Sequence, residues 1–292
     1  MSSPAEMTDV QSGESRARHR WRRLTENKLN LLTMLLLVAL VCVAVFSDLI
    51  APFSATKPAG MPISLPSWDH LLGTDEIGRD VFSRVIHGTR ISLYVGLGAT
   101  TIALLIGVPL GMISGYFGRF TDGVIMRLVD GMLAFPPIIL AMATVAVLGP
   151  NLRNTIIAIG VVQVPRFARQ ARAVASSMRE REFVQASRAL GGSHLHVMAR
   201  ALLPNMAPVI TVQATLTFAT AVLTEAALSF LGLGAQPPTA SWGAMLNTGK
   251  TLLSLNPWIA VGSGMAIFVT VLLFTLLGDT LTDLLNPYRI ER

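Results

Sequence analysis

Long apolar runs separated by short polar segments dominate the pattern of this chain. Six runs approach the roughly 20 residues that cross a bilayer as a helix, namely residues 29–50, 92–113, 131–149, 155–174, 208–234 and 257–278. Three arginines interrupt the fourth run, residues 155–174, so we expect it to continue as a helix beyond the membrane. The pattern therefore predicts an all-α, polytopic membrane protein with six transmembrane helices.

Composition agrees with a membrane protein and leaves little room for bound cofactors. The chain is 52% hydrophobic and only 14% charged, which is more apolar surface than one soluble core requires. The single cysteine, Cys42, lies inside the first apolar run, so neither a disulfide framework nor a cysteine metal site can form. The five histidines make no ligand cluster, and His194 and His196 are expected to be solvated on a loop. We expect no cofactor and no metal.

Basic residues orient the chain. If the N-terminus is cytoplasmic, 17 of the 23 lysines and arginines lie inside and six lie outside, as the positive-inside rule requires. Residues 1–28 then form a basic cytoplasmic segment, 51–91 an external loop and 287–292 a cytoplasmic tail. We interpret the basic leader as an uncleaved membrane anchor, not as a signal peptide or a nucleic-acid-binding arm.

Small residues recur every four positions along the second apolar run, at Ala99, Ala103, Gly107, Gly111 and Gly115. Such a ridge lets another helix backbone approach closely, which is how membrane helices associate without a hydrophobic drive. Packing is the role expected of it.

Glu225 is the only acid well inside a predicted span. An acid in the membrane is costly and is a functional candidate by default, but it can equally hydrogen-bond a neighbouring helix. Both interpretations stay open. No relay of acids accompanies it, as an ion-coupled carrier would require.

A charged island with one apolar face, residues 175–204, interrupts the membrane pattern. Phe183, Ala186, Ser187 and Leu190 fall at i, i+3, i+4 and i+7, so they share one helix face. Gly191 and Gly192 are expected to end this helix after about three turns, because glycine tolerates the left-handed backbone of a cap. A helix this short needs a partner surface. A helix lying on lipid is the alternative, but a face of one Phe and one Leu is weak for membrane binding.

The spacing in this island resembles the cytoplasmic "EAA" loop of binding-protein-dependent ABC importers. Gln185, Ala186 and Ser187 stand where that pattern has Glu-Ala-Ala, and Gly191 and the Leu203-Pro204 pair match it. Pro204 also suits the first turn of the next membrane helix, where a missing N–H costs nothing. The resemblance implies that the ATPase-coupling residues are Phe183, Ala186, Ser187, Leu190, Gly191 and Pro204.

Further motifs, in order along nearly the whole chain, are similar to those of the oligopeptide, dipeptide and nickel permease family, specifically its second, C-type permease subunit. The matching segments are Leu72-Gly73-Thr74-Asp75, Gly78-Arg79-Asp80, Gly115-Tyr116-Phe117-Gly118, Met126-Arg127, Ala134-Phe135-Pro136, residues 229–234, Pro237-Pro238, Ser241-Trp242-Gly243 and Leu277-Gly278-Asp279. Near the C-terminus, Asn286-Pro287 stands where the family usually has Asp-Pro.

This resemblance implies a type I ABC importer permease fold, with both termini cytoplasmic and the transmembrane domain over residues 92–286. It implies a bacterial or archaeal plasma membrane protein without enzymatic activity. Its partners would be a homologous permease, two cytoplasmic ATP-binding subunits and an external solute-binding protein, and its cargo a peptide or related small solute. Pathway candidates are Phe135, Pro136, Glu225 and Ser229. Residues 72–80 and 236–246 would meet the solute-binding protein or form ordered lids over the helix ends.

Two other classes compete with this interpretation. An ion-gradient-driven secondary transporter is the alternative, and it would want an unwound polar site at mid-membrane with coupling acids. A membrane-embedded enzyme is third, and it would want clustered His, Asp or Ser near one face. The segment Asn247–Thr251 ends like a phosphate-binding loop, but Ala244 stands where that motif needs its first glycine.

Overall fold

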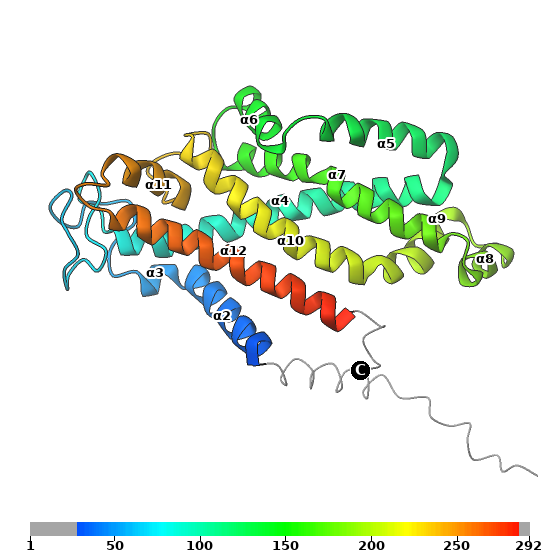
Figure 1. Cartoon of the computed structure of the whole chain (residues 1–292), viewed down its shortest axis with the longest axis horizontal. Coiled ribbons are helices and arrows are strands. Elements are labelled where there is room, and N and C mark those ends of the chain that lie inside the picture. Colours follow the sequence, from blue (N-terminus) through cyan, green and yellow to red (C-terminus); the bar gives the residue numbers. More distant parts are fainter. Residues whose placement is uncertain (1–27, 286–292) are drawn as a thin grey trace, which may run out of the picture.

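The computed structural model describes residues 28–285 as one elongated bundle of helices (Figure 1). Predictions about the basic N-terminal segment, the Asn286-Pro287 pair and the C-terminal tail lie outside the described residues. The helices, in chain order, are α2 (Lys28–Val45), α3 (Ser47–Ile50), α4 (Val81–Phe117), α5 (Arg119–Leu133), α6 (Pro137–Leu148), α7 (Leu152–Met178), α8 (Glu182–Ala189), α9 (His194–His196), the π-helical η2 (Val197–Leu202), α10 (Leu203–Phe230), α11 (Trp242–Thr251) and α12 (Trp258–Leu285).

The predicted all-α class is confirmed. Within residues 28–285 no strand forms, and extended backbone pairs only at an isolated bridge between Thr74 and Asp80. Four helices are long and apolar enough to cross a membrane, and the bent pair α5 and α6 would make a fifth; the four are α2, α4, the continuous helix His194–Phe230 and α12. The 27-residue α7 carries the three interrupting arginines. The number of six spans stays a prediction.

Two helices differ in extent from the apolar runs that predict them. The second helix contains the run 92–113 but begins at Val81, where the Asp80 carboxylate accepts the Ser83 N–H at 2.7 Å and caps the helix. The third run is broken, since α5 and α6 meet at an angle of 89°. The break lies at Ala134–Pro136, where Pro136 and Pro137 offer no N–H to continue the ladder.

The small-residue ridge of α4 packs against α7, as predicted. A Cβ added at Gly111 would lie only 2.1 Å from the carbonyl oxygen of Ala168, and one at Gly115 only 2.5 Å from that of Arg172. Ala99 and Ala103 continue the ridge and are fully buried. The two backbones therefore touch along most of the bundle, which only glycine and alanine allow.

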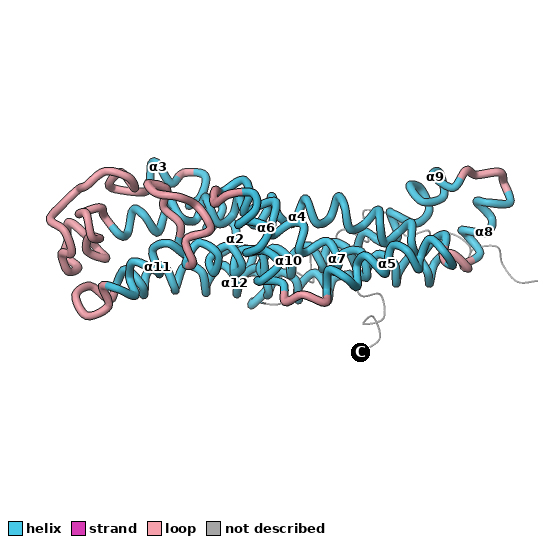
Figure 2. The backbone as a smooth tube through the Cα atoms, turned by 90° about the horizontal axis from the view of Figure 1, so that it is seen from above, coloured by secondary structure: helices cyan, strands magenta, loops and turns pink. Residues whose placement is uncertain are grey.

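The two ends of the bundle differ in character (Figures 1 and 2). The loop of residues 51–80 and helix α11 lie at one end, and α8 and α9 lie at the other. Near the start of α2, the Asn30 side-chain oxygen accepts the Thr280 hydroxyl, near the end of α12, at 3.1 Å. The first and last described helices therefore have their outer ends at the same level of the bundle.

Buried hydrogen bonds and an ion pair hold the loop of residues 51–80 in place. The amide of Asn256, which is fully buried, donates to the carbonyls of Ser64 (3.1 Å) and Thr74 (3.1 Å). The Arg79 guanidinium pairs with Asp75 at 2.6 Å, and both side chains are buried. Residues 72–80 are therefore ordered, and their contact with a solute-binding protein stays a prediction.

Candidate functional site

Helix α8 has a well-defined beginning and end. Arg181 precedes it in extended backbone, and the chain leaves it through Gly191 at φ +81°. The Gly192 N–H donates to the Ser187 carbonyl at 3.0 Å and the Gly191 N–H to the Arg188 carbonyl at 2.9 Å, which is a Schellman motif. The predicted glycine cap is confirmed. The helix has eight residues, just over two turns, and is shorter than expected.

The face predicted for α8 points away from its own chain. Phe183 is 40% exposed and Leu190 is 89% exposed, Ala186 is also exposed, and Ser187 is half-buried. The residue that fastens α8 to the bundle is Val184, fully buried in the cluster that contains Val197, Leu202 and Met206. Sequence reasoning missed Val184, although it is the largest apolar residue of the helix outside that face.

A polar tether also joins α8 to the end of α4. Tyr116 is buried, and its hydroxyl accepts the Arg188 Nε–H at 3.1 Å. The Arg188 guanidinium lies 4.5 Å from the centre of the Tyr116 ring, a cation–π contact. The same hydroxyl lies 2.9 Å from Nδ1 of His194 in α9. The expectation that His194 is merely solvated on a loop is wrong, because it belongs to a helical turn and contacts Tyr116.

From α9 onward one helix runs the length of the bundle. His194–Phe230 is continuous, with a π-helical segment over Val197–Leu202. Such π segments often mark functional sites in helices. Pro204 is exposed and is the second residue of α10, where the continuous helix changes from π-helical to α-helical. The helix therefore links the surroundings of α8 to the far end of the molecule.

At that far end lies Glu225, with no exposed surface. The hydroxyls of Ser229 and Ser241 donate to its Oε1 at 2.7 and 3.0 Å. Ser241 directly precedes α11, so the carboxylate joins α10 to the start of that helix. Of the two interpretations left open for Glu225, the structure shows hydrogen bonding to a neighbouring element. Its role in the pathway stays a prediction.

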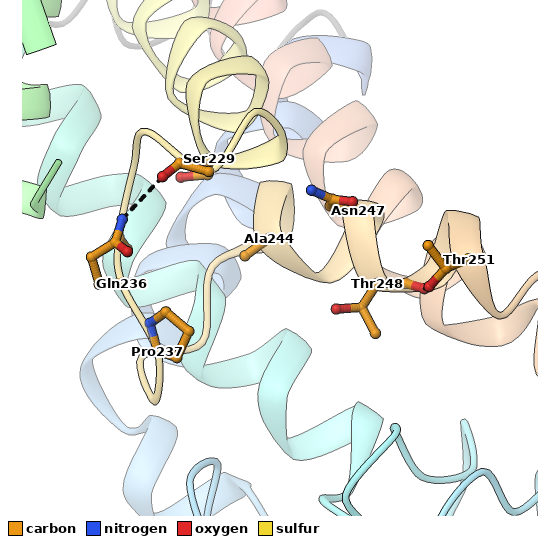
Figure 3. Close-up of a pocket in the computed structure, with 9 residues that line it drawn as sticks. Ser229, Gln236, Pro237, Ala244, Asn247, Thr248 and Thr251 are labelled. Carbon is orange, nitrogen blue, oxygen red and sulfur yellow. Dashed lines mark hydrogen bonds between the residues drawn. The ribbon is translucent and has the colours of Figure 1, made fainter. Parts of the chain in front are cut away.

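Beside this carboxylate is a pocket of about 320 Å³, built from the end of α10, the turn after it and one face of α11 (Figure 3). Ser229 lines it, together with Gln236, Asn247 and Thr248, whereas Glu225 does not. The structure brings Glu225 and Ser229 together. Phe135 and Pro136 lie instead on the surface, at the break between α5 and α6.

Known proteins resemble this chain over nearly its whole length. The family described as "Binding-protein-dependent transport system inner membrane component" matches residues 107–290, more than half of the chain. The family described as "N-terminal TM domain of oligopeptide transport permease C" matches residues 15–66.

Curated relatives carry consistent names. The dipeptide transport system permease protein of Alkalihalophilus pseudofirmus is 43% identical, over 92% of this chain and 89% of that one. The di/tripeptide transport system permease protein of Pseudomonas aeruginosa is 42% identical, over 91% of this chain and 90% of that one. The glutathione transport system permease protein of Escherichia coli O157:H7 is 41% identical, over 91% and 89%.

Among solved structures, an inward-facing form of the MetNI methionine ABC transporter matches with a TM-score of 0.56 at 19% identity, covering 70% of this chain and 97% of that one. This likeness shows the fold alone. The alternative of a secondary transporter is not supported, because both the family and the fold are those of ABC transporter membrane subunits. The chain belongs to the family of inner membrane components of binding-protein-dependent transport systems, as a multi-pass, C-type permease of the ABC importer class.

Proposed function

We propose that this chain pairs with a homologous permease to form a pathway for small peptides across the membrane. Two cytoplasmic ATP-binding subunits drive the pair, an external solute-binding protein delivers the peptide, and this chain carries no catalytic residue of its own. The relatives named for dipeptide, di/tripeptide and glutathione transport support a peptide substrate.

The observation that carries the proposal is the outward face of α8. Phe183 and Leu190 expose apolar side chains at one tip of the bundle, on a helix that is fastened to the rest of the chain through Val184 and Arg188. An amphipathic helix lays such a face into a groove of a partner protein. Arginine placement makes this tip cytoplasmic, so the partner that fits is the ATP-binding subunit.

Two connections suit α8 to pass on the motion of that partner. Val184 packs into the helical core, and Arg188 holds Tyr116 at the end of α4. The continuous helix His194–Phe230 then reaches from this tip to the Glu225 hydrogen bonds at the other. A displacement of α8 by ATP binding would therefore reach both α4 and the far end of α10, and switch the pathway between inward and outward facing.

Reconstituted transport tests this proposal. The chain, its partner permease, the ATP-binding subunits and the binding protein are assembled in liposomes, and uptake of a radiolabelled dipeptide is measured. We expect uptake to require ATP and the binding protein, and to survive an ionophore that collapses ion gradients. Uptake that continues without the ATP-binding subunits and stops with the ionophore would contradict the proposal and support an ion-gradient-driven secondary transporter instead.

A further inference from the structure

Helix α11 turns one face toward the pocket beside Ser229. Ala244, Asn247, Thr248 and Thr251 line the pocket and stand at i, i+3, i+4 and i+7. The other face is buried and includes Trp242. The indole N–H of Trp242 donates to the Val85 carbonyl of α4 at 2.9 Å, which fixes the rotation of α11 about its axis. The pocket face is thus set by the fold.

The chemistry of this face is uniform, because none of the nine lining residues carries a charge. Exposed polar faces of helices usually carry Lys and Glu. Here the polar side chains are amides and hydroxyls. The Glu225 carboxylate is fully buried and accepts a hydrogen bond from Ser229, and Asp75 and Glu76 lie in a second, smaller hollow that also contains Thr248. A neutral polar lining suits a ligand that presents hydrogen bonds without requiring a counter-charge.

Several of these groups have bonding capacity left. The Gln236 amide uses its N–H groups on the carbonyls of Gly232 (3.2 Å) and Gly234 (3.0 Å), which leaves its oxygen as an acceptor (Figure 3). Asn247 donates once, to the Phe230 carbonyl at 2.6 Å, and keeps one N–H and its oxygen. The hydroxyl of Thr248 takes no part in these bonds. The lining therefore offers both donors and acceptors.

We propose that this pocket binds a main-chain amide group of a di- or tripeptide as it enters the pathway, with the charged ends of the peptide outside the neutral lining. A peptide unit presents one N–H and one C=O, which amide and hydroxyl side chains match irrespective of the peptide's own side chains. The volume of about 320 Å³ lies at the lower end of ligand pockets, which suits one or two peptide units within the lining. The inference rests on the proposed function and adds to it where, and by which chemistry, the peptide is held.

The position of the pocket would couple binding to the transport cycle. Its walls come from α10 and α11, and the Glu225 carboxylate of α10 accepts the hydroxyl of Ser241, which directly precedes α11. A shift of α10 relative to α11 would change the width of the pocket. Because α10 is part of the helix that begins beside α8, a motion of α8 would widen the pocket and release the peptide.

Matched variants test this site in the reconstituted importer, at saturating peptide-loaded binding protein. Thr248→Val removes one hydroxyl with almost no change of shape, and Thr56→Val makes the same change at an exposed position of the loop of residues 51–80, outside the lining. We expect Thr248→Val to lower the uptake rate about three- to tenfold, the effect of one hydrogen bond. Thr56→Val should leave it unchanged. The reduction should be equal for Ala-Ala and Leu-Leu, because the main chain is recognised.

A labelling experiment separates peptide binding from other effects. In a Cys42→Ala background, Thr248→Cys and Thr56→Cys are each labelled with a maleimide, with empty or peptide-loaded binding protein present. We expect loaded protein to slow labelling several-fold at Thr248→Cys alone. Equal slowing at both positions, or unchanged uptake by Thr248→Val with wild-type uptake intact, would overturn this inference. Failure of the wild type to take up any peptide would instead overturn the proposed function.

Discussion

Replacing Gly111 with alanine should loosen the contact between α4 and α7. The added Cβ would lie 2.1 Å from the carbonyl oxygen of Ala168 and 2.8 Å from Cβ of Ala171. Ordinary contacts begin near 3.4 Å, so α7 must retreat by roughly 1.3 Å at this point. A backbone carbonyl cannot rotate out of the way as a side chain can, so the whole helix segment has to move.

The size of the effect follows from packing. A gap of about 0.5–1 Å forfeits a quarter to a half of each atomic contact of about 0.1–0.2 kcal/mol, and many contacts along the ridge are affected. Overpacked sites typically cost about 1–3 kcal/mol, whereas alanine gains about 1 kcal/mol over glycine in a helix. Because the clash is with backbone, we expect a net destabilisation of about 2 kcal/mol.

The assay is thermal unfolding of the detergent-solubilised complex, followed by loss of the monodisperse peak, with yields normalised to membrane expression. We expect Gly111→Ala to lower the midpoint by about 4–8 °C. Gly123→Ala in α5 is the matched control, because a Cβ there meets nothing within 4 Å, and it should leave the midpoint unchanged or slightly higher. Gly111→Leu should prevent assembly, whereas Ile113→Leu nearly conserves volume and should be mild. Equal midpoints for Gly111→Ala and Gly123→Ala would refute the inferred backbone contact.

Three further outcomes are expected. Leu190→Asp should uncouple uptake from ATP hydrolysis while the protein stays in the membrane, because a carboxylate buried unpaired in a groove costs several kcal/mol; Val184→Asp should instead reduce folded yield, and wild-type uptake by Leu190→Asp would disprove the coupling role. An impermeant thiol reagent should label Met61→Cys in intact cells, and a reporter fused after Arg292 should be cytoplasmic; protection of Met61→Cys would refute the topology. Glu225→Leu should lower the unfolding midpoint more than Glu225→Gln, because two serine hydroxyls lose their acceptor at about 1–3 kcal/mol each; equal midpoints would contradict the tether.

Some features follow from local sequence because their physical cause is local. The Gly191-Gly192 cap of α8, the break at Pro136-Pro137 and the ridge of Gly107, Gly111 and Gly115 each depend on residues that are close along one helix. Even so, the apolar run does not show where α4 begins, because Ser83, Arg84 and His87 precede that run and are nevertheless helical.

The tether of α8 depended on distant contacts. Tyr116 and Arg188 are 72 residues apart, so no periodicity within α8 could reveal their hydrogen bond. The same holds for Val184, whose burial is decided by what η2 and α10 place against it. The sequence pattern of α8 predicted one face that would contact a partner. The structure shows two faces: one packs on the chain through Val184, and the other exposes Phe183 and Leu190.

Hydrophobic runs, arginine placement and motif spacing by themselves determined that this chain is a helical membrane protein of the importer family, because desolvation of the backbone in lipid leaves a helix as the only local solution. Only the tertiary structure decided what the polar residues do. It brought Ser241 to Glu225 and turned Asn247, Thr248 and Thr251 toward one pocket with Gln236. Hydrogen bonds and pockets join residues through space, and the relative rotation of packed helices, which sets them, is not written in the period of any one helix.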